Sequence, residues 1–211
     1  MNYLAHLLLA EATEDGLLGS LYGDFVKGRP DPTLAPGIRR GIVLHRSIDT
    51  YTDAHPMHRR SRARFHGTRR RFAGVIVDLC YDHFLCRHWG RFSNEPLASF
   101  TARVYTLLAT RHAELPPRLA RIAPHMAAQD WLGSYADLHA VGRALDGIAT
   151  RRPRLAPLRG SLEDIRHRYP ALHEDFDIFF RDLQRYASQR RGELIEAAHD
   201  PTAARATCND G

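Results

Sequence analysis

The chain has 211 residues, of which 44% are hydrophobic and 26% are charged. This length suits one folded domain with one core, and the composition excludes a disordered or fibrous chain. The formal net charge is +6, supplied mostly by arginine, which favours an anionic partner. Nucleic acid is disfavoured as that partner, because aromatic residues are not interleaved with the basic runs and no nucleic-acid motif is present.

Apolar residues recur at spacings of three and four along most of the chain, whereas sustained alternation with β-branched residues is absent. The pattern predicts an all-α fold, a single-domain helical bundle over residues 1–197. Residues 198–211 carry short side chains without a core pattern, which predicts a flexible tail. Helices are expected at 3–12, 16–28, 36–51, 56–66, 69–90, 96–113, 117–132, 135–149, 161–168 and 170–197.

The first twelve residues are apolar, but they lack a basic leader and a small-residue cleavage site, and His6 and Glu11 interrupt them. They match neither a signal peptide nor a membrane span. The three cysteines are an odd number, so a disulfide framework is not expected. Together these features predict a cytoplasmic protein that does not enter a membrane.

The segment 69–90 carries two carboxylates within an apolar stretch. Asp78 and Asp82 are four residues apart, so a helix places both on one side with their Cβ atoms about 6 Å apart. Two adjacent buried carboxylates repel each other and lose hydration unless a cation or a shared proton intervenes. A divalent metal ion would compensate them, and so would Arg46 or the arginines near 69–71, so the spacing leaves both alternatives open.

The segment 36–51 repeats this geometry with a histidine. His45 and Asp49 are four residues apart, and an imidazole nitrogen and a carboxylate oxygen on one helical face can chelate a metal ion. The alternative is that His45 bonds to a neighbouring backbone group while Asp49 pairs with Arg46 or Arg39. The spacing alone does not separate these two interpretations.

Three further candidates share apolar surroundings. His6 lies among leucines, Asp24 lies within GDFVKG, and His83 follows Asp82. A single histidine among leucines is more often a hydrogen-bonded core residue than a ligand. Histidines and aspartates with apolar neighbours are concentrated in the first half of the chain, and together they favour a metal site more than any one of them does. Motifs of serine hydrolases, P-loop proteins, dinucleotide-binding proteins and HExxH metalloproteases are absent.

Five blocks occur in the order NYLAHL, GDFVKG, LHRSIDTYTDAHP, DLCYDHFLCRHW and ATRRPRL. Over residues 1–190 they resemble the acyl carrier protein phosphodiesterase family. The resemblance implies hydrolysis of the phosphodiester that joins 4′-phosphopantetheine to a serine of holo-acyl carrier protein. It also implies a divalent ion, Mn²⁺ first and Mg²⁺ or Fe²⁺ as alternatives, and a helical fold distantly related to the HD-type phosphohydrolases.

The chain departs from the HD-type enzymes in one respect. The adjacent His-Asp pair that names them occurs only at His199-Asp200, in the expected tail, and we do not treat it as a ligand pair. The resemblance implies metal-assisted hydrolysis, in which the ion polarises a phosphoryl oxygen and activates a water. The ligands it implies are His45, Asp78 and Asp82, followed by Asp24 and His6. Asp49 and His83 would orient ligands or transfer protons, and Arg46 would hold a phosphate oxygen.

The arginine excess fits this partner, because acyl carrier proteins are acidic helical proteins. The run between 59 and 71 would steer such a partner, although a solvated helical face is an equal alternative from charge pattern alone. A second candidate contact is the block of Arg151, Arg152 and Arg154. The proposed partner-binding residues of the first run are Arg59, Arg60, Arg62, Arg64, Arg69, Arg70 and Arg71.

Two other functions compete with this one. The first is an HD-like phosphohydrolase of a nucleotide or another small phosphate ester, with the same metal ion but a closed pocket. The second is a helical binding module without enzymatic activity, in which the inward carboxylates form structural ion pairs. Bound metal and a rise in thermal stability with added Mn²⁺ would separate the enzymes from the module.

Overall fold

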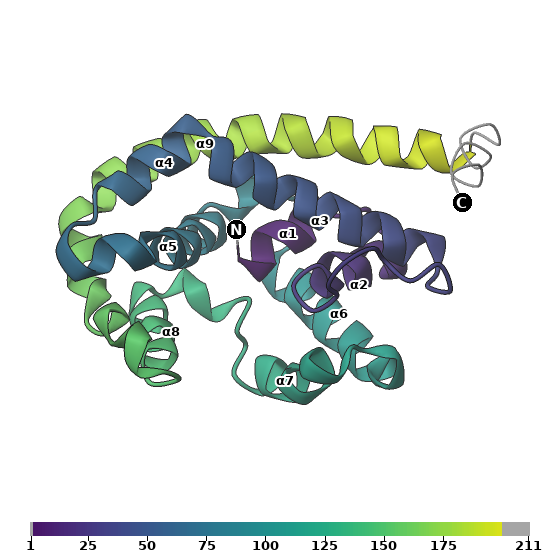
Figure 1. Cartoon of the computed structure of the whole chain (residues 1–211), viewed down its shortest axis with the longest axis horizontal. Coiled ribbons are helices and arrows are strands. Elements are labelled where there is room, and N and C mark those ends of the chain that lie inside the picture. The colour runs from purple at the N-terminus through teal and green to yellow at the C-terminus, as the bar shows by residue number, and fades with distance from the viewer. Residues whose placement is uncertain (1, 200–211) are drawn as a thin grey trace.

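The computed structural model describes residues 2–199, and the ordered elements in that range are all helices (Figure 1). The all-α prediction is therefore confirmed for the described residues. The α-helices are α1 (Tyr3–Leu9), α2 (Glu14–Tyr22), α3 (Pro36–Ala54), α4 (Pro56–Ala63), α5 (Ala73–Arg87), α6 (Leu97–Thr110), α7 (Pro117–Ala128), α8 (Leu138–Ala149) and α9 (Ser161–His199). Five 3₁₀ helices lie between them, at η1 (Gly67–Phe72), η2 (Trp89–Arg91), η3 (His112–Glu114), η4 (Ser134–Ala136) and η5 (Pro153–Leu158).

Three of the differences from the predicted helices change the element to which residues are assigned. The predicted helix 16–28 ends at Tyr22, so Asp24 lies in the turn that follows α2. The first part of 69–90 is the 3₁₀ helix η1, and α5 begins only at Ala73. The predicted helices 161–168 and 170–197 are one helix, α9. The predicted tail 198–211 begins inside α9, which ends at His199, and its residues from 200 onward lie outside the described residues. The side chains of the His199-Asp200 pair are not described either.

Helix α9 continues through Pro170 because both flanks of this proline are held in the core. Ile165 and Leu172, on either side of it, are fully buried. Proline lacks a backbone N–H and commonly bends a helix rather than ending it when packing is strong. In Figure 1 the first part of α9 rises at the left, and the rest runs along the top beside α3. The apolar side chains of α1 to α9 form one core beneath it.

Helices α2 and α3 touch backbone to backbone. A Cβ atom on Gly19 would lie 2.3 Å from the carbonyl oxygen of Ile38, and one on Gly41 would lie 2.8 Å from the Gly19 backbone. Just beyond α2, a Cβ atom on Gly23 would lie 2.2 Å from the ring of His45. These contacts allow no side chain at the three glycines, so the turn after α2 is held close to the imidazole on α3. None of the described helices is both long and apolar enough to cross a membrane.

Candidate metal centre and active-site cleft

Two imidazoles and a carboxylate meet between α1 and α3. The Nε2 atom of His6 lies 3.0 Å from Oδ1 of Asp49, and Nε2 of His45 lies 3.2 Å from Oδ2 of the same carboxylate. The two rings are stacked, with centroids 3.7 Å apart and planes inclined by 13°. His6 is 1% exposed and His45 is 2% exposed. The helical spacing of His45 and Asp49 predicted their contact, and the packing of α1 against α3 adds His6.

Asp24 joins this group from the turn after α2. Its Oδ1 atom lies 3.6 Å from Nε2 of His45. Arg46 fixes the following loop, because its two terminal nitrogens donate to the carbonyl oxygens of Val26 and Gly28, both at 2.6 Å. The Arg46 guanidinium, which the sequence suggested for a phosphate oxygen or an ion pair with Asp49, therefore bonds to the loop that begins with Asp24.

The protonation of these residues follows from their contacts. Burial, and then the charge of His45, lowers the pKa of His6 to about 4. Burial also lowers the pKa of His45, but its contacts with Asp24 and Asp49 outweigh burial and raise the pKa to about 9. The same contacts outweigh burial at Asp24 and Asp49 and lower the pKa of both carboxyl groups. At neutral pH the group thus holds one imidazolium between two carboxylates.

The donor set fits a divalent ion. His6, His45 and Asp49 each offer a ligand atom, and these atoms lie within 4.8 Å of one another. The Nδ1 atoms of both histidines are buried without a hydrogen-bond partner among the described residues. Unpartnered buried polar atoms are rare in proteins and call for a water or an ion nearby. Imidazole and carboxylate donors suit first-row divalent metals, so these three residues and Asp24 can hold such an ion.

Asp78, on α5, lines a cleft of about 870 Å³ together with Asp24. The Nε2 atom of His58, on α4, lies 3.3 Å from Oδ1 of Asp78, and His58 itself is buried. The charge of Asp78 lies near enough to Asp49 for the two carboxylates to repel each other. Asp78 thus lies near the group formed by His6, His45 and Asp49, and His58 contacts it from α4.

Asp82 does not share the environment of Asp78, although the two are one helical turn apart. Its carboxylate is fully buried and accepts hydrogen bonds from the backbone N–H groups of Leu4 at 3.2 Å and Ala5 at 3.4 Å. These donors belong to the first turn of α1, whose N–H groups have no partner within the helix. The structure assigns Asp82 a positioning role: it anchors the helix that carries His6. Its assignment as a ligand stays a prediction.

His83 lies on the side of α5 that faces η4 and α9. Its Nδ1 atom is 2.7 Å from the carbonyl oxygen of Tyr135, which can only accept, so Nδ1 is the protonated nitrogen. The Nε2 atom then accepts from the hydroxyl of Tyr169 at 2.8 Å. Both ring nitrogens thus have protein partners, and the role of His83 in orienting ligands or transferring protons stays a prediction.

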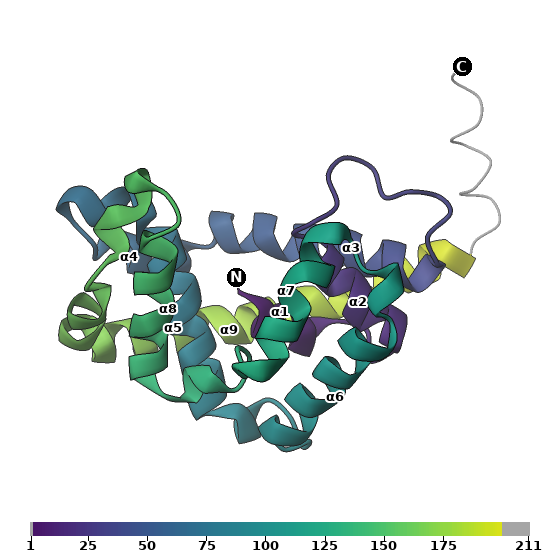
Figure 2. The same ribbon diagram turned by 90° about the horizontal axis from the view of Figure 1, so that it is seen from below.

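The cleft has a second wall that sequence analysis did not identify. Figure 2 shows α5 and α8 on the left and α6 and α7 on the right, and residues of α5, α7 and α8 line the cleft. Its apolar lining includes Tyr3, Phe25, Ile122, Trp131 and Ile148. Four arginines line it as well, at positions 118, 121, 143 and 151. Only Arg151 belongs to a block that the sequence suggested as a contact.

Two arginines of the predicted partner-binding run share one buried carboxylate. Asp175 on α9 is fully buried, and it contacts the guanidinium groups of Arg60 and Arg64. The hydroxyl of Ser61 donates to it at 2.8 Å. This network joins α4 to α9 and uses the charge of both arginines within the protein.

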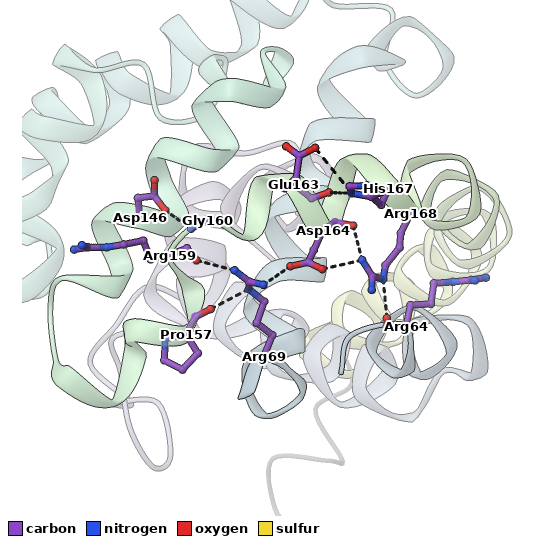
Figure 3. Close-up of polar contacts among 10 residues, drawn as sticks. All are labelled: Arg64, Arg69, Asp146, Pro157, Arg159, Gly160, Glu163, Asp164, His167 and Arg168. Carbon is purple, nitrogen blue, oxygen red and sulfur yellow. Dashed lines mark hydrogen bonds and ion pairs between the residues drawn. The ribbon is translucent and has the colours of Figure 1, made fainter. Parts of the chain in front are cut away.

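Arg69 is also used within the protein (Figure 3). It forms an ion pair with Asp164 at 2.5 Å and donates to the carbonyl oxygens of Pro157 and Arg159. The guanidinium therefore fastens η1 to η5 and to the start of α9. Its role in this structure is to connect these segments.

The remaining arginines of the run differ in their surroundings. Arg59 donates to the backbone carbonyl of Asp53, and Arg62 pairs with the side chain of Asp53 at 3.4 Å. Arg70 and Arg71 are exposed, and no described carboxylate forms an ion pair with them. The charge that this run offers to a partner is thus smaller than the sequence suggests.

Comparison with known proteins identifies the family. Residues 1–183 match the sequence model described as acyl carrier protein phosphodiesterase. The chain belongs to this family. It is 39% identical over 194 residues to the acyl carrier protein phosphodiesterase of Serratia proteamaculans (strain 568), which covers 90% of this chain and 100% of that protein.

Other relatives with the same name are nearly as similar. Those of Salmonella agona (strain SL483) and Escherichia coli O127:H6 are each 38% identical over 191 residues, which is 90% of this chain and 99% of each relative. No solved structure matches the chain. The resemblance to the acyl carrier protein phosphodiesterase family is therefore confirmed, whereas the relationship to the HD fold stays a prediction.

Proposed function

We propose that the chain hydrolyses the phosphodiester between 4′-phosphopantetheine and the serine of holo-acyl carrier protein, with a divalent ion held by His6, Asp24, His45 and Asp49. The observation that carries the metal centre is the convergence of two buried imidazoles on the two oxygens of Asp49. The reaction and its substrate are supported by the shared family and by the printed names of the relatives.

Two properties of these residues favour the binding of a cation: the protonation state of His6 and the charge of the two carboxylates. The lowered pKa of His6 keeps its ring neutral, so a nitrogen lone pair is available at neutral pH. The carboxylates of Asp24 and Asp49 remain ionised and provide negative charge, which now holds a proton on His45. An ion bound there would polarise a phosphoryl oxygen and lower the pKa of a water. Mn²⁺ is the first candidate, with Mg²⁺ and Fe²⁺ as alternatives.

Asp78 has a role distinct from these ligands in the proposal. It reaches the cleft beside Asp24, so it lies on the route by which a phosphodiester approaches the metal centre. The Nε2 atom of His58 forms a hydrogen bond with Oδ1 of Asp78 and would fix the direction of this carboxylate oxygen. Asp78 would complete the ligand set or accept a proton from the attacking water, and His58 would keep it oriented. A cytoplasmic location and an HD-type ancestry remain part of the proposal.

The test is mass spectrometry of holo-acyl carrier protein incubated with the purified protein and Mn²⁺. We expect the carrier to lose the mass of 4′-phosphopantetheine, and we expect a chelator to stop the reaction until Mn²⁺ is returned. Retention of the prosthetic group with fully metal-loaded protein would contradict the proposed function. Equal turnover in chelator and in Mn²⁺ would contradict the metal centre alone.

The competing small-ester hydrolase is favoured by one observation. A cleft of about 870 Å³ lies within the range of pockets that enclose small ligands. Comparing kcat/KM for holo-acyl carrier protein with kcat/KM for free phosphate esters separates the two functions. The proposed function requires that the carrier protein be the better substrate.

A further inference from the structure

Positive charge lines the cleft on both α7 and α8. Arg118 and Arg121 lie on α7, Arg143 lies on α8, and Arg151 follows α8. All four are exposed. We call these four arginines the arginine rim. They come from two helices and the segment after them, so no run of basic residues in the sequence marks the rim.

The rim has little compensating negative charge. Arg143 lies 3.5 Å from Asp137, and this pair is widely exposed, so water screens it. Arg118 lies over the ring of Phe25 at 6.0 Å. Within residues 2–199, no carboxylate forms an ion pair with Arg118, Arg121 or Arg151. The rim therefore has three arginines without a carboxylate partner beside one cleft. Arg59, Arg70 and Arg71 also have none among the described residues, but no arginine of 59–71 lines this cleft.

The size of the cleft determines what can enter it. About 870 Å³ holds a small molecule or an extended prosthetic group, but not a folded protein. A carrier protein must remain outside while its phosphodiester reaches Asp24 and Asp78. The surface of the carrier around the modified serine would then rest on whatever surrounds the cleft, and the arginine rim occupies that position.

We propose that the arginine rim is the docking surface for the acidic carrier protein, in place of the arginines of 59–71, and that the apolar lining receives the pantetheine arm. This inference rests on the proposed function for the identity of the partner. Charge complementarity selects an acidic protein, since four arginines beside one cleft attract a negative surface and orient it over the opening. Arg118 and Arg121 on α7 and Arg143 and Arg151 at α8 would contact the carrier from two sides.

The decisive variant combines Arg121→Glu with Arg151→Glu, and a second adds Arg118→Glu and Arg143→Glu. The matched control is Arg70→Glu with Arg71→Glu, which makes the same change of charge outside the cleft. The first measurement is binding of apo-acyl carrier protein, which has no phosphodiester, by fluorescence anisotropy at two salt concentrations. The second is KM and kcat for holo-acyl carrier protein in Mn²⁺, with hydrolysis of bis(p-nitrophenyl) phosphate in parallel.

We expect the double rim variant to weaken binding of apo-carrier at least about tenfold and to raise KM for holo-carrier by a similar factor. The salt dependence of binding should decrease, because fewer charges then attract the carrier. The loss should be at least about tenfold greater on the carrier than on the small diester. The control variant should bind the carrier as the wild type does.

Three results would overturn the docking surface: unchanged affinity in both rim variants, a greater loss in the control variant, or equal losses on the carrier and the small diester. Circular dichroism of each variant establishes whether it is folded. If the quadruple variant is unfolded, the conclusion is drawn from the double variant. Rim-dependent binding of apo-carrier without hydrolysis of holo-carrier would contradict the proposed function and leave the docking surface standing. Hydrolysis of holo-carrier by the rim variants with an unchanged KM would contradict the docking surface and leave the proposed function standing.

Discussion

The carboxylate of Asp82 accepts a hydrogen bond from the backbone N–H of Leu4, a residue 78 positions earlier in the chain. With the second bond from Ala5, this contact satisfies two N–H groups at the start of α1. These N–H groups have no acceptor within the helix, so the two hydrogen bonds hold the start of α1 against α5. The position of His6 over His45 therefore depends on a side chain of α5.

Replacing Asp82 with Asn should change how stability depends on pH. Burial raises the pKa of the Asp82 carboxyl to about 7 in the folded protein, although the backbone hydrogen bonds oppose this. The unfolded chain loses that proton near pH 4. Between about pH 4 and pH 7 the wild type should thus lose free energy of unfolding relative to Asp82→Asn as the pH rises. Urea melts of both metal-free proteins from pH 4 to pH 8 measure the difference, and a difference independent of pH would contradict the argument.

Asp49→Asn should remove the metal ion and the activity. Asn keeps the size of the side chain but offers one oxygen and no charge where two imidazoles now converge. We expect bound Mn²⁺ and kcat/KM to fall at least about 100-fold. Asp53→Asn is the matched control, because Asp53 lies one turn along α3, is exposed and pairs with Arg62. Metal analysis and carrier assays compare the two, and full metal content in Asp49→Asn would exclude Asp49 as a ligand.

Arg46→Lys should weaken metal binding without removing it. Lysine cannot replace the two nitrogens that donate to Val26 and Gly28, so the loop after Asp24 would be held less firmly. We expect the Kd for Mn²⁺ to rise about tenfold, with activity recovered at saturating Mn²⁺. A titration of activity against Mn²⁺ measures this. If activity stayed low at saturation, Arg46 would act on the substrate instead.

Asp175→Asn should reduce stability far more than an exposed substitution does. Removing this buried charge weakens the hydrogen bonds from Arg60 and Arg64, which are partly exposed, and is expected to cost about 1.5–3 kcal/mol of the free energy of unfolding. Asp177→Asn, which breaks a partly exposed pair with Arg91, should cost about 0–1 kcal/mol. Denaturant melts compare them. Equal losses would show that the Asp175 network adds no special stability.

The sequence predicted the parts of the fold and site that depend on local spacing. The all-α class followed from helical periodicity, and the contact between His45 and Asp49 followed from their separation by four residues. The same spacing did not reveal the hydrogen-bond partners of Asp78 and Asp82, because these partners come from other elements. Asp78 meets His58 on α4, and Asp82 meets the backbone of α1. Spacing within one helix does not determine which neighbour packs against each turn.

Two groups of residues could not be found from local patterns. His58 precedes a basic run, and its burial depends on how α4 packs against α5 and α9. The arginine rim is spread over α7, α8 and the following segment, and only the tertiary fold gathers it beside the cleft. By contrast, several arginines of the run 59–71, which is conspicuous in the sequence, form ion pairs within the protein, such as that of Arg69 with Asp164.

The last helix also has a consequence for the order of events during synthesis. Helix α9 begins at Ser161, yet it packs against α3, α4 and α5, which carry His45, His58 and Asp78. The proposed ligands leave the ribosome before the helix that covers their supporting elements. Contacts so distant in sequence form late. A nascent chain that ends before α9 would thus possess all four proposed ligands without a rigid frame to hold them, and metal binding would begin only after α9 has emerged.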